Sequence, residues 1–363
     1  MKPHYIAVTL TLLFFSSPAA DAASPWGLKP GPVELQSAGP IAFGPDGVLI
    51  VGDAKAAAVY AIDTEDHAKA GKDVSLNVSG LSASITEKLR AKSLSIVDMA
   101  GNPLSKNIYL STLFDGRPSI IRVLTAGEIE RVGLDKVQHA RVEIEGAPDD
   151  KVVGQGRRRR NLRGESITDI AYSDGRVLVS GLSKGDAPSA VREFDFPFSE
   201  NSRATSVEIY HGAHGRFETY AAIRTFVPFN IDGKPSLLAG FTCTPLVKFP
   251  LDALSGGGTV RGTTVAELGN RNRPLDMIVY QKDGKDYLLM ANSSRGVMKI
   301  STADIERENG ITERVSGGGV AGQEYETIDS LKGVVQLDQF DAQHAAVLVK
   351  MDDKDVLKVI DLP

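Results

Sequence analysis

The feature of this sequence that most constrains its fold is a short apolar run that recurs six times. The runs lie 51–69 residues apart and cover residues 48–52, 108–112, 177–181, 236–240, 287–291 and 346–350. Each is too short for a helix and has no 3.6-residue period, so it predicts a strand buried on both faces. Recurrence at this spacing indicates a repeat architecture, in which neighbouring units bury a continuous core.

The residues around each run predict the rest of a four-stranded unit. An earlier strand ends in an Asp-Gly turn, as at Asp46-Gly47, and this dipeptide between apolar runs is a strong hairpin signal. A third apolar strand follows, for example at residues 59–62. A fourth, more polar strand ends in glycine in most units, at residues 74–80, 141–146, 206–212, 263–269 and 311–317.

Four antiparallel strands with an apolar second strand and a polar fourth strand are typical of a β-propeller blade. We therefore predict an all-β chain in which residues 23–363 form a single six-bladed β-propeller, with about 57 residues per blade. The sixth unit ends at Pro363 after its third strand, and we expect residues 33–36 to supply the missing outer strand and close the ring. Two alternatives stay open: a seventh blade within residues 64–106 or 125–166, and a β-sandwich joined to a barrel.

The blade pattern, with phrases such as Phe43-Gly44-Pro45-Asp46-Gly47, resembles the exported bacterial forms of the six-bladed propeller superfamily. That group includes NHL-repeat proteins, gluconolactonase-like lactonases and soluble quinoprotein sugar dehydrogenases. The resemblance covers all of residues 23–363 and implies a ligand site over the central channel. The lactonases hold a divalent cation there, and Asn270, Asn292 and Asp276 would take the corresponding places here. The lactonase Glu-Gly-Pro phrase is absent, because Gly39-Pro40 lacks the acid.

The first residues predict an export signal. Lys2 precedes an apolar run of about 11 residues, 5–15, which is too short to span a bilayer as a helix. Small residues follow at Ala20 and Ala22, so we expect cleavage after Ala22 and a secreted or periplasmic protein without a transmembrane segment. The alternative is an uncleaved anchor. Cys243 is the single cysteine, so no internal disulfide can form.

One face of the predicted ring carries long loops and many arginines. In a propeller, the connections from each outer strand to the next blade lie on the same face as the turns between second and third strands. Three of the connections between blades are long here: 147–165, 211–219 and 318–331. The arginines that we expect on this face are Arg157, Arg158, Arg159, Arg160, Arg163, Arg216, Arg271, Arg273 and Arg295. In a chain of net charge -5, they predict binding of an anionic ligand or an acidic partner protein. The alternative for residues 157–160 is a solvated loop or a proteolytic site.

Two sets of residues are candidate metal ligands. His211, His214 and Glu218 lie close in sequence, and Cys243 is expected on the same face, so together they would suit copper or zinc. Acidic residues expected where the first strands begin, with two amides, could hold Ca²⁺ or another hard cation: Glu165, Glu218, Asp276, Glu326, Asn270 and Asn292. The alternative is that they are polar loop residues and carboxylates that accept backbone N–H bonds.

Two classes of function are compatible with these features. We favour a monomeric binding or scaffold protein, because only 6% of the residues are aromatic and no catalytic set transfers from the resembling families. The alternative is a metal-dependent hydrolase of the lactonase kind, or a periplasmic oxidoreductase, with its site at the channel mouth and no assigned catalytic residue. The negative net charge and the absence of interleaved aromatic residues argue against nucleic-acid binding.

Overall fold

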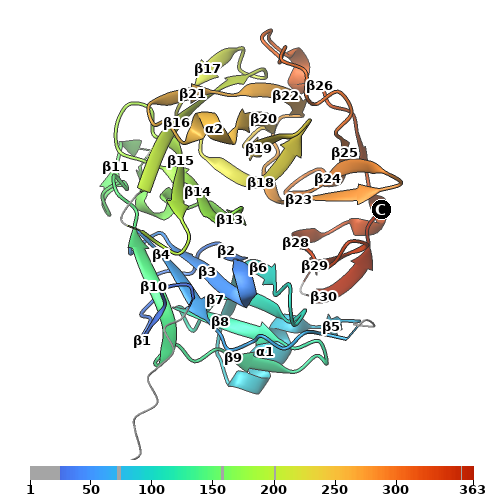
Figure 1. Ribbon diagram of the computed structural model, residues 1–363. Helices are drawn as coiled ribbons and strands as arrows, with labels where there is room; N and C mark the ends of the chain where they lie inside the picture. The colour runs from blue at the N-terminus through green and yellow to red at the C-terminus, as the bar shows by residue number, and fades with distance from the viewer. Residues whose placement is uncertain (1–24, 72–74, 157–158, 200–201, 353) are drawn as a thin grey trace, which may run out of the picture.

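The computed structural model describes residues 25–71, 75–156, 159–199, 202–352 and 354–363. The chain is all-β, with six antiparallel sheets arranged in a ring (Figure 1), and the predicted six-bladed β-propeller is confirmed. The expected export signal and its cleavage site lie outside the described residues. No helix in the described part of the chain is long and apolar enough to cross a membrane.

We number the blades by the order of their first strands in the sequence. The first blade contains β2 (Ile41–Phe43), β3 (Val48–Asp53), β4 (Ala58–Asp63) and β10 (Val137–Glu143), with β1 (Lys29–Gly31) outside it. The second contains β6 (Leu94–Gly101), β7 (Ile108–Phe114), β8 (Arg117–Val123) and β9 (Ile129–Arg131). The third contains β13 (Asp169–Ser173), β14 (Arg176–Leu182), β15 (Ser189–Asp195) and β16 (Ser202–His211), which also pairs with β17 (Arg216–Glu218) and β21 (Thr259–Arg261).

The remaining blades follow the same plan. The fourth contains β18 (Ile223–Ile231), β19 (Lys234–Phe241), β20 (Pro245–Pro250), β22 (Thr263–Leu268) and β26 (Val320–Gly322). The fifth contains β23 (Pro274–Lys282), β24 (Lys285–Asn292), β25 (Gly296–Ser301) and β27 (Tyr325–Thr327). The sixth contains β28 (Val334–Gln339), β29 (His344–Met351), β30 (Lys354–Asp361) and β5 (Asn77–Ser79). Outside the blades lie two short α-helices, α1 (Leu81–Leu89) and α2 (Leu251–Leu254), the hairpin of β11 (Val152–Val153) and β12 (Arg160–Asn161), and short 3-10 turns.

The blades do not follow one another around the ring in sequence order. The inner strand β2 lies between β6 and β13, and β28 lies between β23 and β6 (Figure 1), so the order in space is second, first, third, fourth, fifth, sixth. The chain leaves the first blade after β4, adds β5 to the sixth blade, builds the second blade, and returns as β10 to complete the first. Two blades therefore take their outer strand from a distant part of the chain.

This path corrects three expectations about outer strands. From the expected strand at 74–80, β5 joins the sixth blade, and from the one at 141–146, β10 joins the first. The sixth blade is therefore completed by β5 and not by residues 33–36. Val33 instead donates its backbone N–H to Leu134 O at 2.8 Å, beside the first blade. The expectations were wrong because the local sequence of a polar outer strand does not determine which third strand it pairs with.

The fifth outer strand was also wrongly placed. Its residues are 325–327, which pair with β25, whereas residues 311–317 form no strand there. Ile311 N donates to Thr264 O at 2.8 Å, and Val315 N donates to Gly212 O at 2.9 Å. The backbone hydrogen bonds of this segment therefore join it to the fourth and third blades rather than to the fifth.

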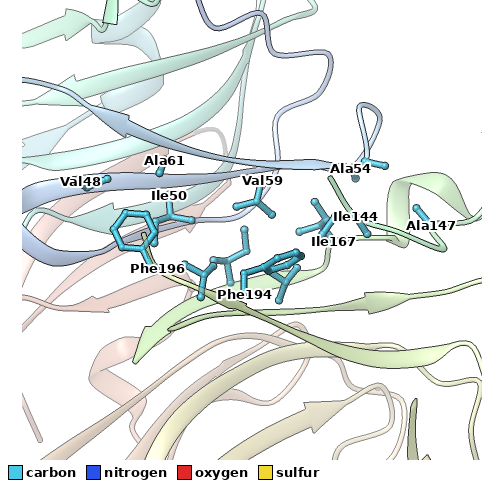
Figure 2. Packing of buried hydrophobic residues seen from close by; sticks show 14 of the residues in the cluster. Val48, Ile50, Ala54, Val59, Ala61, Ile144, Ala147, Ile167, Phe194 and Phe196 are labelled. Carbon is cyan, nitrogen blue, oxygen red and sulfur yellow. The ribbon is translucent and has the colours of Figure 1, made fainter. Parts of the chain in front are cut away.

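The core lies between neighbouring blades. Figure 2 shows the interface of the first and third blades, where Ile50 and Val59 pack against Phe194. Five further clusters occupy the other interfaces and confirm the order of the blades, since each joins residues of two neighbours in the ring. Removing one such valine or isoleucine side chain from water contributes about 1.5–3 kcal/mol.

Candidate functional site

The connections between blades and the turns between second and third strands lie on one face of the ring, which we call the loop face. Arg159 precedes β12, Arg160 lies on it, and Arg163 stands in a short turn before the third blade. Arg216 lies on β17, Arg271 and Arg273 precede β23, and Arg295 lies in the turn between β24 and β25. The topology thus brings seven of the nine predicted arginines to this face, while Arg157 and Arg158 are outside the described residues.

Several of these arginines are exposed and free of carboxylates. Within the described ranges, Arg159, Arg160, Arg271 and Arg273 form no salt bridge, although all four are exposed. Arg295 is half-buried and donates to the backbone oxygen of Asn270 at 3.2 Å. The four exposed guanidinium groups therefore face solvent without an internal counter-charge.

The central channel opens on the loop face through a cavity of about 280 Å³. The beginnings of the inner strands line it, together with Arg224, Arg273, Glu165 and Gln336. Arg224 donates to Glu165 Oε2 at 3.3 Å and to Thr242 Oγ1 at 3.1 Å. Glu165 thus lies near the start of the third blade as predicted, but it is paired with an arginine that sequence reasoning missed.

Deeper in the channel, the six inner strands enclose a second cavity of about 380 Å³ that contains four aspartates. Each accepts the backbone N–H of the neighbouring inner strand: Asp98 from Ile41 at 2.7 Å, Asp169 from Phe226 at 2.7 Å, Asp276 from Leu337 at 2.8 Å and Asp338 from Gly101 at 2.7 Å. These bonds join neighbouring blades, so we call the four residues the channel aspartates. A signal for them exists in the sequence, because each stands in the first strand of its blade.

Burial changes the acidity of the channel aspartates. It raises the pKa of Asp169 to about 7 and that of Asp338 to about 6. The pKa values of Asp98 and Asp276 are raised well above the usual range, first by burial and also by repulsion from Asp169 and Asp338. With its amide nitrogen turned toward them, Gln336 donates to Asp98 Oδ1 at 2.8 Å and to Asp276 Oδ2 at 3.1 Å.

The residues proposed for a hard cation are not gathered in one place. Asp276 uses Oδ1 and Oδ2 for the backbone N–H groups of Met277 and Leu337. Asn292 is buried and accepts a hydrogen bond from Asn272 Nδ2 at 2.8 Å. Glu326 lies on the outer strand of the fifth blade and forms an ion pair with Lys299 at 3.6 Å. The expectation that Glu326 begins a first strand was therefore wrong, because residues 325–327 pair with β25 as an outer strand. Asn270 lies instead against Gly318 in the loop region.

The hairpin of β16 and β17 gathers the other candidate ligands. His211 ends β16, and Glu218 lies on β17 opposite Ile209, so the tight turn between them brings both side chains to one end of the hairpin. His211 Nδ1 lies 3.0 Å from Glu218 Oε2, and His214 Nδ1 lies 2.7 Å from Glu218 Oε1. The two imidazole rings are 3.8 Å apart between centroids. His211 and Glu218 are buried, whereas the side chain of His214 is 44% exposed.

Two further side chains hold the Glu218 carboxylate. The Tyr220 hydroxyl donates to Oε1 at 2.8 Å, and Arg216 Nε donates to it at 3.2 Å. Burial acts to raise the pKa of Glu218, but hydrogen bonds from His211, His214 and Tyr220 outweigh it and hold the pKa at about 2. Glu218 is therefore an ionised, buried carboxylate with two imidazole nitrogens against it.

A second carboxylate lies beneath the turn of this hairpin. Glu267 on β22 accepts the backbone N–H of Gly212 through Oε1 at 2.5 Å. Glu267 Oε2 and His211 Nε2 are both buried, and neither has a hydrogen-bond partner among the described residues. Sequence reasoning missed Glu267, because it belongs to a different blade from the histidines.

Cys243 does not join this cluster. In the described part of the chain, the group of His, Cys, Asp and Glu whose ligand atoms lie within 4.8 Å of one another consists of His211, His214 and Glu218. Cys243 lies in the turn between β19 and β20 with a left-handed φ of 65°, and its backbone N–H donates to Asn272 O at 2.8 Å. The expectation that it is a fourth ligand was wrong, because this turn belongs to the fourth blade and the hairpin extends from the outer strand of the third.

Comparison with known proteins identifies no family for this chain. No family model matches the sequence, and no curated protein matches it. Solved structures that align with it include the Drosophila semaphorin 1b extracellular domains 1–2, at 10% identity and a TM-score of 0.37 over 92% of this chain and 86% of that one. The plexin A4 extracellular region aligns at 11% identity and a TM-score of 0.36, over 86% of this chain and 34% of that one. A chain of the mitotic checkpoint complex aligns at 8% identity and a TM-score of 0.34, over 97% and 100%. The class of this protein, a six-bladed β-propeller, therefore rests on its own strand pairing.

Proposed function

We propose that this protein is an exported scaffold whose loop face binds an acidic partner protein. The observation that carries the proposal is the set of exposed guanidinium groups at Arg159, Arg160, Arg271 and Arg273, which have no salt bridge within the described residues. A planar guanidinium forms paired hydrogen bonds with a carboxylate, and a basic surface on a protein of net charge -5 speeds encounter with an acidic partner.

The channel mouth extends this basic surface inward. Arg273 lines the cavity of about 280 Å³, where Arg224 pairs with Glu165, the single acidic residue among the described residues that line it. A carboxylate inserted here would meet both Arg273 and Arg224, which line this cavity. A lactonase-like cation site at the channel mouth is less well supported, because both oxygens of Asp276 accept backbone N–H groups.

A matched pair of charge reversals tests the loop face. We expect Arg271→Glu with Arg273→Glu to weaken binding of a polyglutamate peptide at least tenfold at low salt, and wild-type binding to weaken steeply as salt is added. Lys234→Glu with Lys285→Glu makes the same charge change at exposed residues that begin β19 and β24, next to turns between first and second strands on the opposite face. If both double variants lose the same affinity for the peptide, the loss reflects only the change in net charge, and the proposal is contradicted.

Export is tested separately. Expressed with its full N-terminus in a bacterial host, the protein is expected in the periplasm or medium, with an N-terminal sequence that begins at Ala23. Retention in the membrane at full length would support the uncleaved anchor instead.

A further inference from the structure

We propose that His211, His214 and Glu218 bind one divalent transition-metal ion of the zinc class, through two imidazole nitrogens and one carboxylate. The inference does not depend on the loop face binding a partner. It concerns the end of the β16–β17 hairpin, where the three ligand atoms already lie within 4.8 Å of one another.

The spacing of the ligand atoms is close to that of an occupied site. In a tetrahedral zinc site, metal–nitrogen and metal–oxygen distances of about 2.0–2.1 Å place neighbouring ligand atoms about 3.3 Å apart. Here the Nδ1 atoms of His211 and His214 lie 3.0 and 2.7 Å from the two oxygens of Glu218. All three ligand atoms lie within 4.8 Å of one another, so shifts of the side chains alone would bring them around one ion.

The two unpaired buried atoms at this site could form a hydrogen bond with each other in the metal-bound form. When His211 Nδ1 binds the ion, its proton must reside on Nε2, which then needs an acceptor. Within the described ranges, His211 Nε2 is buried without a partner, and so is Glu267 Oε2, whose carboxylate lies under the same turn. Metal-bound imidazoles regularly donate their other N–H to a carboxylate, which orients the ring and strengthens the ligand. Glu267 is thus the carboxylate that would position His211 in the metal-bound form, once Glu267 Oε2 and His211 Nε2 move within hydrogen-bond distance of each other.

The hairpin supplies the order that a metal site needs. The Tyr220 hydroxyl holds Glu218 Oε1 through a hydrogen bond of 2.8 Å. The antiparallel register of β16 and β17 fixes the positions of His211 and Glu218 relative to each other. Arg216 also contacts this oxygen, but its side chain is 63% exposed and can return to solvent when an ion takes its place. Because the side chain of His214 is 44% exposed, the ion would keep a coordination position open to solvent.

The ligand set selects the kind of metal. Imidazole nitrogens suit zinc and copper, whereas calcium and magnesium prefer sites made entirely of oxygen. Two histidines and a single carboxylate are therefore unsuited to the hard cations, and zinc is the appropriate probe.

The test uses the full mature chain, purified without a histidine tag, stripped with chelator and titrated with Zn²⁺. We expect saturable binding of one ion, and at least a tenfold weaker affinity in His214→Ala and in Glu218→Gln. His344→Ala is the matched control, because His344 pairs with Asp341 at 2.8 Å through Nδ1 and with Asp361 at 3.3 Å through Nε2, yet in the described part of the chain it belongs to no group of ligand atoms within 4.8 Å of one another. Cobalt(II) added to the stripped protein provides a second measurement, since its visible spectrum reports nitrogen and oxygen ligation.

Each result decides the proposal. Because His214 is largely at the surface, His214→Ala is expected to fold, so loss of zinc binding in this variant reports on the ligand itself. Arg216→Gln removes a competing cation and is expected to tighten zinc binding severalfold. Absence of saturable binding in the wild type overturns the proposal, and so does an affinity that His214→Ala leaves unchanged. The cluster would then be a hydrogen-bonded group that closes the hairpin.

Discussion

Asp338 on β28 accepts the backbone N–H of Gly101 on β6 at 2.7 Å, across a sequence separation of 237 residues. This bond joins the sixth blade to the second, which are neighbours in space although they are far apart in the chain. Asp98, Asp169 and Asp276 make the same kind of bond at three other boundaries. The channel aspartates therefore hold neighbouring blades together along the axis of the ring.

Removing one channel aspartate should weaken the whole ring. We expect Asp338→Ala to lower the free energy of unfolding by about 1–3 kcal/mol, because it leaves the N–H of Gly101 without its charged acceptor. Urea denaturation measures the change. Asp361→Ala, at a side chain that is 95% exposed, is the control and should alter stability by no more than about 0.5 kcal/mol. Equal effects in the two variants would argue against the bracing role.

The acidity of Asp169 predicts how stability depends on pH. A carboxyl whose pKa rises on folding binds its proton more tightly in the folded chain, so its contribution to stability is complete below its unfolded pKa of about 4. That contribution is lost as pH rises through the folded pKa of about 7. The wild type should therefore lose stability relative to Asp169→Asn between pH 4 and pH 8. Urea midpoints of both proteins across this range give the comparison, and a difference that stays constant with pH would refute it.

Close packing between the first and third blades makes Gly52 intolerant of a side chain. A Cβ atom there would lie 2.8 Å from Ile167 Cγ2 and from Ile170 Cδ1, in the cluster that Figure 2 shows. We expect Gly52→Ala to destabilise the protein by about 1–3 kcal/mol, through overpacking. Thermal unfolding measures this loss. Gly133→Ala, where the new methyl group meets no atom within 4 Å, should leave the stability nearly unchanged in the same experiment.

The unusual order of the blades can be tested by a cross-link. Asn77 on β5 is the register partner of Lys358 on β30. We expect Asn77→Cys with Lys358→Cys to form a disulfide in the Cys243→Ser background, because directly opposed residues of antiparallel strands lie within reach of one. Peptide mapping without reduction detects it. Gln36→Cys with Lys358→Cys represents the closure that the sequence suggested, and a disulfide in that variant alone would contradict the observed path.

The arrangement of ligands on the loop face shows where prediction from the sequence ends. His211, His214 and Glu218 were predicted as a group because they lie within eight residues of one another in a single loop. Glu267 and Arg224 were missed, although Glu267 contacts the same turn and Arg224 shares the channel mouth with Arg273. Both come from other strands, so their positions depend on how the third and fourth blades pack.

The sequence by itself determined that this chain consists of short antiparallel strands in six units. Apolar runs and Asp-Gly turns act on neighbouring residues, so their meaning does not depend on the rest of the fold. Only the tertiary structure decided which outer strand completes which blade, and that Cys243 stays apart from the histidines. A polar edge strand can pair with any open edge of suitable length. The choice is made by packing between distant segments, as when Leu81 and Ile85 of α1 enter the core beside β30 and place β5 in the sixth blade.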